Sequence, residues 1–462
     1  MKKKMRIKLA IPLYLNEISA AINATNLYHT NIPIEYISTD SREITSSDLF
    51  IPLKGKRFNG EDYIEDCLKK GAVCITEKRR DNCLYVKNAE NALLALANYY
   101  KIKLKKLKKT VAITGSVGKT TTKEMLKIIC SQSFKTFATL ENMNNTIGVP
   151  LSILSAPKDT EILILELGMN HLGEISKLSK CASPDIGVIT NIGSAHIGNL
   201  GSRENIAAAK LEILDGMKKP RLVIPYDEHL LSEQKNALTF STKSERADVY
   251  IYNNEGNIFL KTESVEADVN FAPRGDAALN CLCAAVAAAA EIGIPLHLIK
   301  SAISLISSDI LRQRMILVDD LTILADYYNA SFESIVSSID LLNSYTEYKY
   351  RSILLGSVYE LGDKSEEIHR NIGAYAAKAR PHRLFIIGEY VNAILEGALS
   401  CGMKEENIFV NNSLSAPKTT AMQIAKNCTD GELILFKASH RADLGRIVEC
   451  LKEICAERSL SQ

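Results

Sequence analysis

Short apolar runs recur through the middle of the chain, and stretches with helical periodicity separate them. The runs expected to be buried strands are 111–114, 162–167, 186–191 and 222–225. Helices are expected at 207–213 and at the alanine-rich 277–290. An alternation of strands and helices predicts a mostly parallel sheet with helices on both faces. The middle of the chain is therefore expected to be an α/β domain.

Similar patterns flank this middle part on both sides. The first hundred residues contain expected strands near 36–39, 48–53 and 73–76, with an amphipathic helix that ends at Lys70. In the last part, the expected strands are 321–326, 352–356, 383–387 and 433–436, and the expected helices are 331–343 and 366–380. This second open sheet is of the dinucleotide-fold type, but it lacks a GxGxxG sequence, so no second nucleotide site is indicated.

A lysine-rich stretch at 101–109 separates the first part from the second. Such a stretch could contact a polyanion, but a solvated helix end followed by a linker is the preferred interpretation. We therefore expect an α/β fold with three domains. They are an N-terminal α/β domain at 1–105, a central parallel-sheet domain at 106–311 and a C-terminal dinucleotide-fold-like domain at 312–462.

A glycine loop stands between the expected strand at 111–114 and a helix that begins near Thr120. Gly115 and Gly118 free the backbone for a tight turn, and the amides at the start of the helix favour an anion. Lys119 adds a full positive charge, and the hydroxyl of Thr120 suits a magnesium ion that bridges phosphates. Ile113 stands near the place of the first glycine of the standard phosphate loop, so this loop is a variant. The sequence predicts a nucleotide-phosphate site, and a plain glycine turn is the alternative.

Polar residues at the ends of neighbouring strands are candidates for the same site. In open α/β sheets ligands bind outside the carboxyl ends of the strands, where Glu166 and Asn191 stand and where the loop leading to His196 begins. A carboxylate and a histidine beside a nucleotide are sensible ligands for a divalent cation. From spacing alone, Lys210 is either a site residue or a surface lysine.

Composition narrows the classes of protein. A chain of 462 residues is expected to form about two to four domains. Its net charge of +2 gives no case for nucleic-acid or membrane binding. The 11 cysteines include no CxxC pair, which fits a reducing cytoplasm. A signal peptide after the N-terminal lysines is rejected because the apolar part is short and interrupted, and no run is long enough to span a membrane.

Several segments, taken in order, resemble motifs of the Mur ligases, the amide ligases of peptidoglycan synthesis. The resembling central segments are 114–124, 139–151, 166–175, 190–196 and 201–204. The pattern at 40–42, 48–50 and Gly55 resembles the family's UDP-substrate domain. Segments of the last part that are similar to further family motifs are 326–330, 360–362 with His369, and 437–441.

The resemblance implies an ATP-dependent ligase that activates a substrate carboxylate as an acyl phosphate and then joins it to an amine. The acidic-amino-acid adder has an Asp-Asn-Pro-Arg segment in its last domain, and this sequence has none. That absence favours the branch that adds D-alanyl-D-alanine to a UDP-N-acetylmuramoyl tripeptide. The implied cofactors are ATP and Mg²⁺ at two sites, and a monomer in the cytoplasm is expected, with neither nucleic acid nor membrane insertion.

The resemblance also implies roles for individual residues. Lys119, His196 and Lys210 are the implied catalytic residues, and Lys210 matches the position that family members carbamylate. One magnesium is implied at Thr120 and Glu166, and a second at His196. The implied ATP contacts are Gly115, Ser116, Val117, Gly118, Lys119, Thr120, Thr121, Asn280, Arg314 and Asp326. The implied substrate contacts are Ser41, Arg42, Asn142, Asn144, Asn145 and Asn329.

The sequence departs from the family's pattern mainly on the adenine and amine sides. The departing positions are Asp276, Ala277, Ala325, Ser331, Phe332, Ser357 and Ala438.

Three alternatives accompany the main interpretation. One is another Mur ligase that extends a UDP-linked dipeptide, and the second is a Mur-like binding protein without turnover. A generic P-loop switch is disfavoured because Glu166 stands where the usual strand-ending aspartate is expected.

Overall fold

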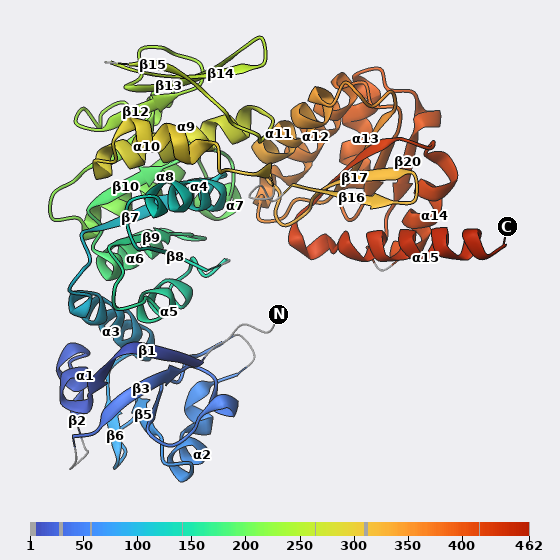
Figure 1. Ribbon diagram of the computed structural model, residues 1–462. Coiled ribbons are helices and arrows are strands. Elements are labelled where there is room, and N and C mark those ends of the chain that lie inside the picture. The colour runs from blue at the N-terminus through green and yellow to red at the C-terminus, as the bar shows by residue number, and fades with distance from the viewer. Residues whose placement is uncertain are drawn as a thin grey trace.

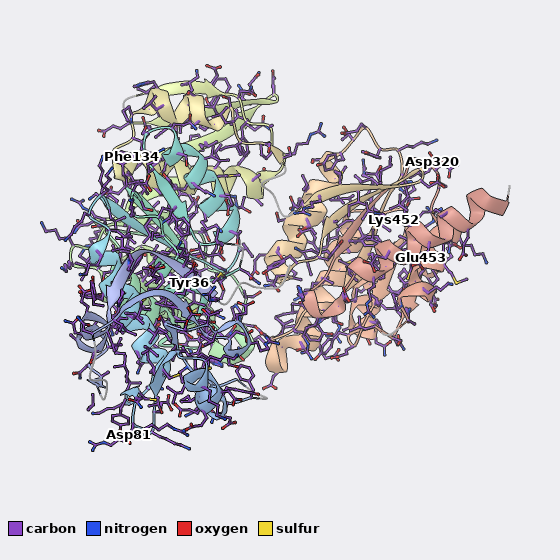
Figure 2. All side chains as sticks on the ribbon, turned by 60° about the horizontal axis from the view of Figure 1, so that its bottom comes forward. Tyr36, Asp81, Phe134, Asp320, Lys452 and Glu453 are labelled. Carbon is purple, nitrogen blue, oxygen red and sulfur yellow. The ribbon has the colours of Figure 1, made fainter. Side chains whose placement is uncertain are left out.

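A computed structural model describes residues 6–26, 31–55, 58–140, 142–263, 265–308, 313–414 and 416–461. Three sheets follow one another along the chain, and each sheet with its helices is called a unit below (Figure 1). The third unit stands beside the first two, and Figure 2 shows Asp320, Lys452 and Glu453 on that side of the molecule. The expected boundary at residues 311 and 312 and the N-terminal lysines lie outside the described residues.

The first unit is a mixed sheet in the order β1-β3-β4-β5-β6-β2. Its strands are β1 (Arg6–Tyr14), β2 (Thr25–Asn26), β3 (Pro33–Ser38), β4 (Asp48–Phe50), β5 (Val73–Thr76) and β6 (Cys83–Tyr85). Its helices are α1 (Leu15–Ala21), α2 (Ile64–Lys69) and α3 (Ala89–Lys103). The strands β3 to β6 are parallel, while β1 and β2 are antiparallel additions at the two edges.

The second unit holds a sheet in the order β15-β14-β13-β12-β11-β10-β7-β9-β8. The strands are β7 (Lys109–Thr114), β8 (Thr136–Ala138), β9 (Ile162–Glu166), β10 (Ile186–Ile189), β11 (Leu222–Pro225), β12 (Leu238–Ser241), β13 (Val249–Asn254), β14 (Asn257–Thr262) and β15 (Glu266–Val269). Pairing is parallel from β8 to β13, as the alternation of elements predicted. The antiparallel extension β13-β14-β15 was not predicted.

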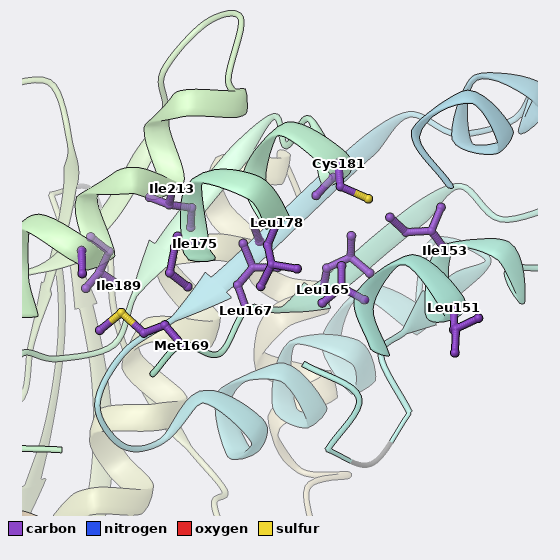
Figure 3. Packing of buried hydrophobic residues seen from close by; sticks show 14 of the residues in the cluster. Leu151, Ile153, Leu165, Leu167, Met169, Ile175, Leu178, Cys181, Ile189 and Ile213 are labelled. Carbon is purple, nitrogen blue, oxygen red and sulfur yellow. The ribbon is translucent and has the colours of Figure 1, made fainter. Parts of the chain in front are cut away.

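Helices cover both faces of this sheet, because successive residues of its buried strands point to opposite sides. The helices are α4 (Lys119–Ser131), α5 (Gly148–Leu154), α6 (Glu174–Ala182), α7 (Ile197–Leu200), α8 (Arg203–Leu211), α9 (Asp276–Ile292) and α10 (Leu296–Ile303). Leu163 and Leu165 of β9 pack on the side of α5 and α6, whereas Ile162 and Ile164 pack on the side of α4, α9 and α10. Figure 3 shows Leu165 among residues of the first side. This packing fixes the strand ends that carry the candidate site.

The third unit is a sheet in the order β16-β17-β21-β18-β19-β20. The strands are β16 (Arg314–Val318), β17 (Leu321–Asp326), β18 (Arg351–Gly356), β19 (Leu384–Ile387), β20 (Ile408–Asn411) and β21 (Leu433–Lys437). The helices are α11 (Phe332–Ser344), α12 (Ser365–Lys378), α13 (Val391–Ser400), α14 (Pro417–Asn427) and α15 (Gly445–Ser461). The core residues of α11 to α13 and those of α14 and α15 fall into separate clusters, one on each face of the sheet. The predicted dinucleotide-fold-like arrangement is thus confirmed.

The junction of the first and second units is more closely packed than the sequence predicted. Lys101 of α3 donates hydrogen bonds from Nζ to the carbonyl oxygens of Ala182 and Ser183, the latter at 2.8 Å. Burial lowers the pKa of the Lys101 ammonium. The prediction of a solvated helix end is therefore wrong for Lys101, which joins α3 to the end of α6. Within the described residues, no helix has the length and apolar character needed to cross a membrane.

Candidate active site

The glycine loop between β7 and α4 adopts backbone geometry that only glycine accommodates well. Gly118 has a φ of +83°, and a Cβ added at Gly115 would lie 1.8 Å from Oγ1 of Thr190. Asn191 supports the loop from the next strand, because its Oδ1 accepts hydrogen bonds from the amides of Ser116 and Val117 at 3.0 Å each. The structure thus places Gly115, Ser116, Val117 and Gly118 in one tight turn, as predicted.

Helix α4 begins directly after this turn, with Lys119, Thr120 and Thr121 in its first positions. The first amides of a helix have no acceptor within the helix, and they carry the positive end of its dipole. Nζ of Lys119 lies over the turn, where it donates to the carbonyl oxygens of Gly115 at 2.7 Å and Ser116 at 3.3 Å. The turn, the helix start and the ammonium together can bind a polyphosphate.

Glu166 lies at the carboxyl end of β9, buried beside the start of α4. Oγ1 of Thr120 donates to its Oε2 at 2.7 Å, and Nδ2 of Asn144 donates to its Oε1 at 2.8 Å. The described residues contain no cluster of three His, Cys, Asp or Glu that could hold a metal ion. A hydroxyl and a carboxylate are nevertheless the hard oxygen ligands that Mg²⁺ takes when phosphates complete its coordination. The oxygen set therefore fits one magnesium ion.

A second layer of residues, which the sequence analysis missed, fixes the backbone around Glu166. The fully buried Lys123 donates from Nζ to the carbonyl oxygen of Thr139 at 2.6 Å. Oγ1 of Thr139 in turn accepts a hydrogen bond from the amide of Glu166 at 2.9 Å. Lys123 has no sequence signal of its own, because a lysine on a helix normally extends into solvent.

His196 lies in the loop after β10, in a left-handed conformation with a φ of +66°. Nδ1 of His196 donates to the Glu360 carboxylate of the third unit at 2.7 Å. Burial and the nearby Lys119 cation lower the pKa of His196, while Glu360 opposes this shift. The ring is therefore near the phosphate loop, as predicted, but a residue from another unit holds it.

Lys210 of α8 is 1% exposed, so the interpretation as a surface lysine is wrong. Burial, with a smaller contribution from Lys119, lowers its pKa well below the ordinary lysine value. A lysine with a depressed pKa is neutral for more of the time and is therefore a nucleophile. The structure brings Lys119, His196 and Lys210 into electrostatic reach of one another.

The residues predicted to hold adenosine are more dispersed. Asn280 is exposed near the start of α9, where its Oδ1 accepts from Oγ1 of Thr242 at 3.0 Å. Arg314 lines a cavity of about 450 Å³ at the junction of the second and third units. The full lining is Arg274, Ser308, Gln313, Arg314, Met315, Leu341 and Tyr345. Asp326 contacts this lining through Gln313, whose Nε2 donates to Oδ2 at 3.3 Å.

The predicted substrate residues lie in three separate places. Oδ1 of Asn145 accepts from the amide of Gly148 at 2.8 Å and so caps α5, while the neighbouring Asn142 is half-buried. Ser41 and Arg42 lie on a single helical turn of the first unit, and Arg42 pairs with Asp40 at 2.5 Å. Asn329 lies at the edge of the third sheet, where its carbonyl oxygen accepts from Nζ of Lys437 at 3.1 Å.

One departure from the family pattern keeps its local structural role. Ser331 begins α11, accepting at Oγ from the amide of Ser334 at 3.3 Å, while Oγ of Ser334 accepts from the amide of Ser331 at 2.9 Å. This reciprocal capping satisfies two amides at the helix start. The helix therefore begins at Phe332 without the Asn-Pro pair that the family usually has there.

Comparisons with known proteins agree with this geometry. Residues 33–114 match the Mur ligase family catalytic domain, and residues 113–289 match the Mur ligase middle domain. The UDP-N-acetylmuramoyl-tripeptide--D-alanyl-D-alanine ligase of Bacillus subtilis (strain 168) is 34% identical over 435 residues, which cover 91% of this chain and 93% of the relative.

Two solved structures share the arrangement of elements. A crystal structure of MurF from Acinetobacter baumannii superposes with a TM-score of 0.86 at 28% identity, covering 97% of this chain and 100% of that one. MurF ligase from Thermotoga maritima, solved in complex with ADP, gives a TM-score of 0.78 at 28% identity, with 91% and 98% covered. The chain belongs to the Mur ligase family, and it resembles members that add D-alanyl-D-alanine over most of its length.

Proposed function

We propose that this chain is an ATP-dependent ligase that joins D-alanyl-D-alanine to a UDP-N-acetylmuramoyl tripeptide in cytoplasmic peptidoglycan precursor synthesis. The observation that carries the proposal is the group of Lys119, Thr120, Glu166 and Asn144 around the phosphate loop. The Bacillus subtilis relative, a UDP-N-acetylmuramoyl-tripeptide--D-alanyl-D-alanine ligase, supports these substrates, and the Thermotoga maritima structure in complex with ADP supports the nucleotide.

The reaction is a phosphoryl transfer followed by an acyl transfer. The terminal carboxylate of the tripeptide attacks the γ-phosphorus of ATP, which gives an acyl phosphate and ADP. The amine of D-alanyl-D-alanine then attacks the acyl carbon, loses a proton, and displaces inorganic phosphate. Positioned cations lower the barrier of the first step because charge is spread over the transferring oxygens. Lys119 supplies such a cation at the β- and γ-phosphates.

Two magnesium sites are part of the proposal. Thr120 and Glu166 would hold one ion, and His196 would hold the other. Bound Mg²⁺ neutralises charge on the transferring phosphoryl group. The Lys210 amine is proposed to react with carbon dioxide, forming a carbamate and releasing a proton. Its depressed pKa supports this step because only the neutral amine is nucleophilic, and the carbamate anion would face the Lys119 cation.

The three units divide the substrates among them. We place the UDP group at Ser41 and Arg42, and adenosine between Asn280, Arg314 and Asp326 beside the cavity of about 450 Å³. The amine substrate is assigned to the third unit, and the proposed domains are 1–105, 106–311 and 312–462. Asn142, Asn145 and Asn329 remain predicted contacts of the acceptor, while Asn144 is proposed to act through Glu166.

The direct test is phosphate release measured with ATP and each acceptor, combined with mass detection of the product. We expect release that depends on both a UDP-linked tripeptide and D-alanyl-D-alanine. A product formed only from the UDP-linked dipeptide and a single amino acid would favour the other Mur ligase. Release with neither acceptor, or none under any combination, would contradict the proposed activity.

A further inference from the structure

The loop between β10 and α7 is held from outside by the third unit. Glu333, in the first turn of α11, accepts a hydrogen bond from the amide of Ser194 at 2.6 Å and another from its Oγ at 3.1 Å. The backbone approaches this carboxylate closely, since a Cβ added at Gly193 would lie 2.9 Å from the Glu333 carboxyl carbon. One carboxylate thus fixes the first half of the loop.

A second carboxylate of the third unit fixes the other half. Nδ1 of His196 donates to Oε2 of Glu360 at 2.7 Å, and the carbonyl oxygen of Glu360 accepts from the amide of Gly198 at 3.1 Å. Gly198 and Gly362 make this approach possible, because a Cβ at Gly198 would lie 2.4 Å from the Gly362 nitrogen. Glu360 itself has a φ of +67°, an unusual backbone conformation for a residue with a side chain.

The same loop is tied to the phosphate site from the inside. The amide of Gly193 donates to Oγ of Ser116 at 2.9 Å, and Asn191 holds the amides of Ser116 and Val117. Hydrogen bonds at its two ends and the Gly193–Ser194 peptide bond between them therefore link Glu333 to Ser116. The position of the third unit is thereby linked to the geometry of the phosphate loop.

We propose that Glu360 and Glu333 are positioning residues that complete the metal side of the phosphate site from the third unit. The inference rests on the proposed function, in which His196 binds Mg²⁺. Histidine ligands of metals usually donate their second ring nitrogen to a carboxylate, which fixes the tautomer and the ring direction. With Nδ1 donated to Glu360, Nε2 is the nitrogen that faces a metal.

A role in stability alone explains these contacts poorly. The Glu360 side chain is 52% exposed, and exposed ion pairs contribute little to folding free energy. Both carboxylates instead act on one short loop that ends at the proposed metal ligand. The unit assigned to the amine substrate thereby fixes the loop that carries the proposed metal ligand.

The test is calorimetric titration of the full chain with ADP, with and without Mg²⁺. The variants are Glu360→Gln and Glu333→Gln, and the matched control is Glu367→Gln on the exposed side of α12. Loss of a carboxylate that orients a metal ligand typically weakens metal binding about 10- to 100-fold. We expect the half-saturating Mg²⁺ concentration to rise by about that factor in both variants and to stay unchanged in the control. ADP binding without Mg²⁺ should be the same in all four proteins.

A second variant separates positioning from general destabilisation. Gly193→Ala keeps every charge but pushes the Glu333 carboxylate away, so it should raise the Mg²⁺ requirement as Glu333→Gln does. The double variant Gly193→Ala with Glu333→Ala should need no more Mg²⁺ than Glu333→Ala alone, because the added methyl group at position 193 has no carboxylate left to displace. Thermal unfolding of each variant shows whether the fold is intact.

The outcomes separate the inference from the proposed function. If the unchanged chain binds ADP with a Mg²⁺ requirement but both glutamine variants match the control, the positioning role is wrong. If Mg²⁺-free ADP binding falls together with the melting temperature, the carboxylates are merely structural, which also overturns the inference. Failure of the unchanged chain to bind ADP at all would instead contradict the proposed ATP-dependent activity.

Discussion

The carboxyl edges of the second and third sheets differ in how their polar residues are used. At the second edge, Thr120 and Asn144 converge on Glu166, which leaves its oxygens beside a loop built to bind phosphate. At the third edge, Asp326 and Asn329 are held by Lys437, with Nζ 2.9 Å from the Asp326 carboxylate. Ser338 donates a further hydrogen bond to Asp326 at 2.6 Å.

The motif residues at the two edges therefore have different roles. At the second edge the buried carboxylate accepts hydrogen bonds from two neutral groups, Thr120 and Asn144, whereas at the third edge a lysine cation pairs with the buried carboxylate. Lys437 of β21 contacts both Asp326 and the carbonyl oxygen of Asn329, so it ties the loop that leads to Glu333 to the sheet. The third unit therefore contributes carboxylates on a well-bonded surface that hold the loop of His196.

Removing the cation of the second edge should have the largest effect. Lys119→Ala is expected to lower turnover about a thousand-fold or more, because phosphoryl transfer loses a charge at the β- and γ-phosphates. Steady-state phosphate release measures the effect, and thermal unfolding should show little change in stability. Near-normal turnover would contradict the assignment of the phosphate site.

Breaking the third edge should act first on stability. Lys437→Met leaves the Asp326 carboxylate buried without its ion-pair partner, which is expected to cost about 3 kcal/mol. Urea unfolding followed by circular dichroism measures this cost. The double variant with Asp326→Asn should recover part of it, and a single variant as stable as the unchanged chain would contradict the internal role of the pair.

Lys210→Ala is expected to lower turnover about a hundred-fold, because the variant lacks the proposed carbamate, an anionic group that would support magnesium binding beside the phosphate site. Short-chain carboxylates such as acetate should restore part of the activity of this variant. Lys177→Ala, on the exposed side of α6, is the control. Its turnover should equal that of the unchanged chain and should not change when acetate is added. Full activity of Lys210→Ala without acetate would remove the carbamate hypothesis.

The smallest effect concerns His369 of α12, which supports the loop leading to Glu360. Its Nδ1 donates to the carbonyl oxygen of Ser365 at 2.6 Å, and its Nε2 accepts from the amide of Val358 at 2.9 Å. Burial lowers the pKa of His369 in the folded protein. Below a pH of about 6.5 the histidine of the unfolded chain is protonated, whereas the buried ring of the folded chain stays neutral to a lower pH. Stability contributed by the neutral ring is therefore lost as the pH falls below about 6.5.

This pH dependence can be measured by urea unfolding at pH 8 and at pH 5. His369→Gln should lose less stability between the two values than the unchanged chain does, because glutamine does not titrate. His297→Gln, at an exposed histidine of α10, should leave the difference unchanged. Equal losses in all three proteins would show that the buried ring does not govern this part of the profile.

Local sequence patterns were enough to predict most of the fold. Apolar runs placed β9, β11, β17 and β18 close to their observed bounds, because buried strands of parallel sheets are apolar on both faces. Strand β16 was missed although residues 315–318 form a short apolar run; the strand lies at a sheet edge, where Met315 and Leu317 are exposed.

The residues of the candidate site also divide into those that local sequence predicts and those that it does not. Gly118 and Lys119 could be predicted because one strand, one loop and one helix create their chemistry locally. Glu166 could be predicted because it ends a neighbouring strand at the same edge of the sheet. Glu333 and Glu360 could not be predicted, since their role exists only where two units meet. Asn145 has a structural role that its motif did not predict, because its side chain accepts a hydrogen bond at the start of α5, and its substrate contact stays a prediction.

The central claim is that a carboxylate is activated by phosphoryl transfer at the second edge. The most direct measurement uses a UDP-linked tripeptide whose terminal carboxylate carries ¹⁸O at both oxygens, with mass analysis of the phosphate released. When the carboxylate attacks the γ-phosphorus, one of its oxygens leaves with phosphate after the amine attacks. The account predicts one ¹⁸O in each released phosphate and a product that contains D-alanyl-D-alanine. Unlabelled phosphate released during product formation would contradict it.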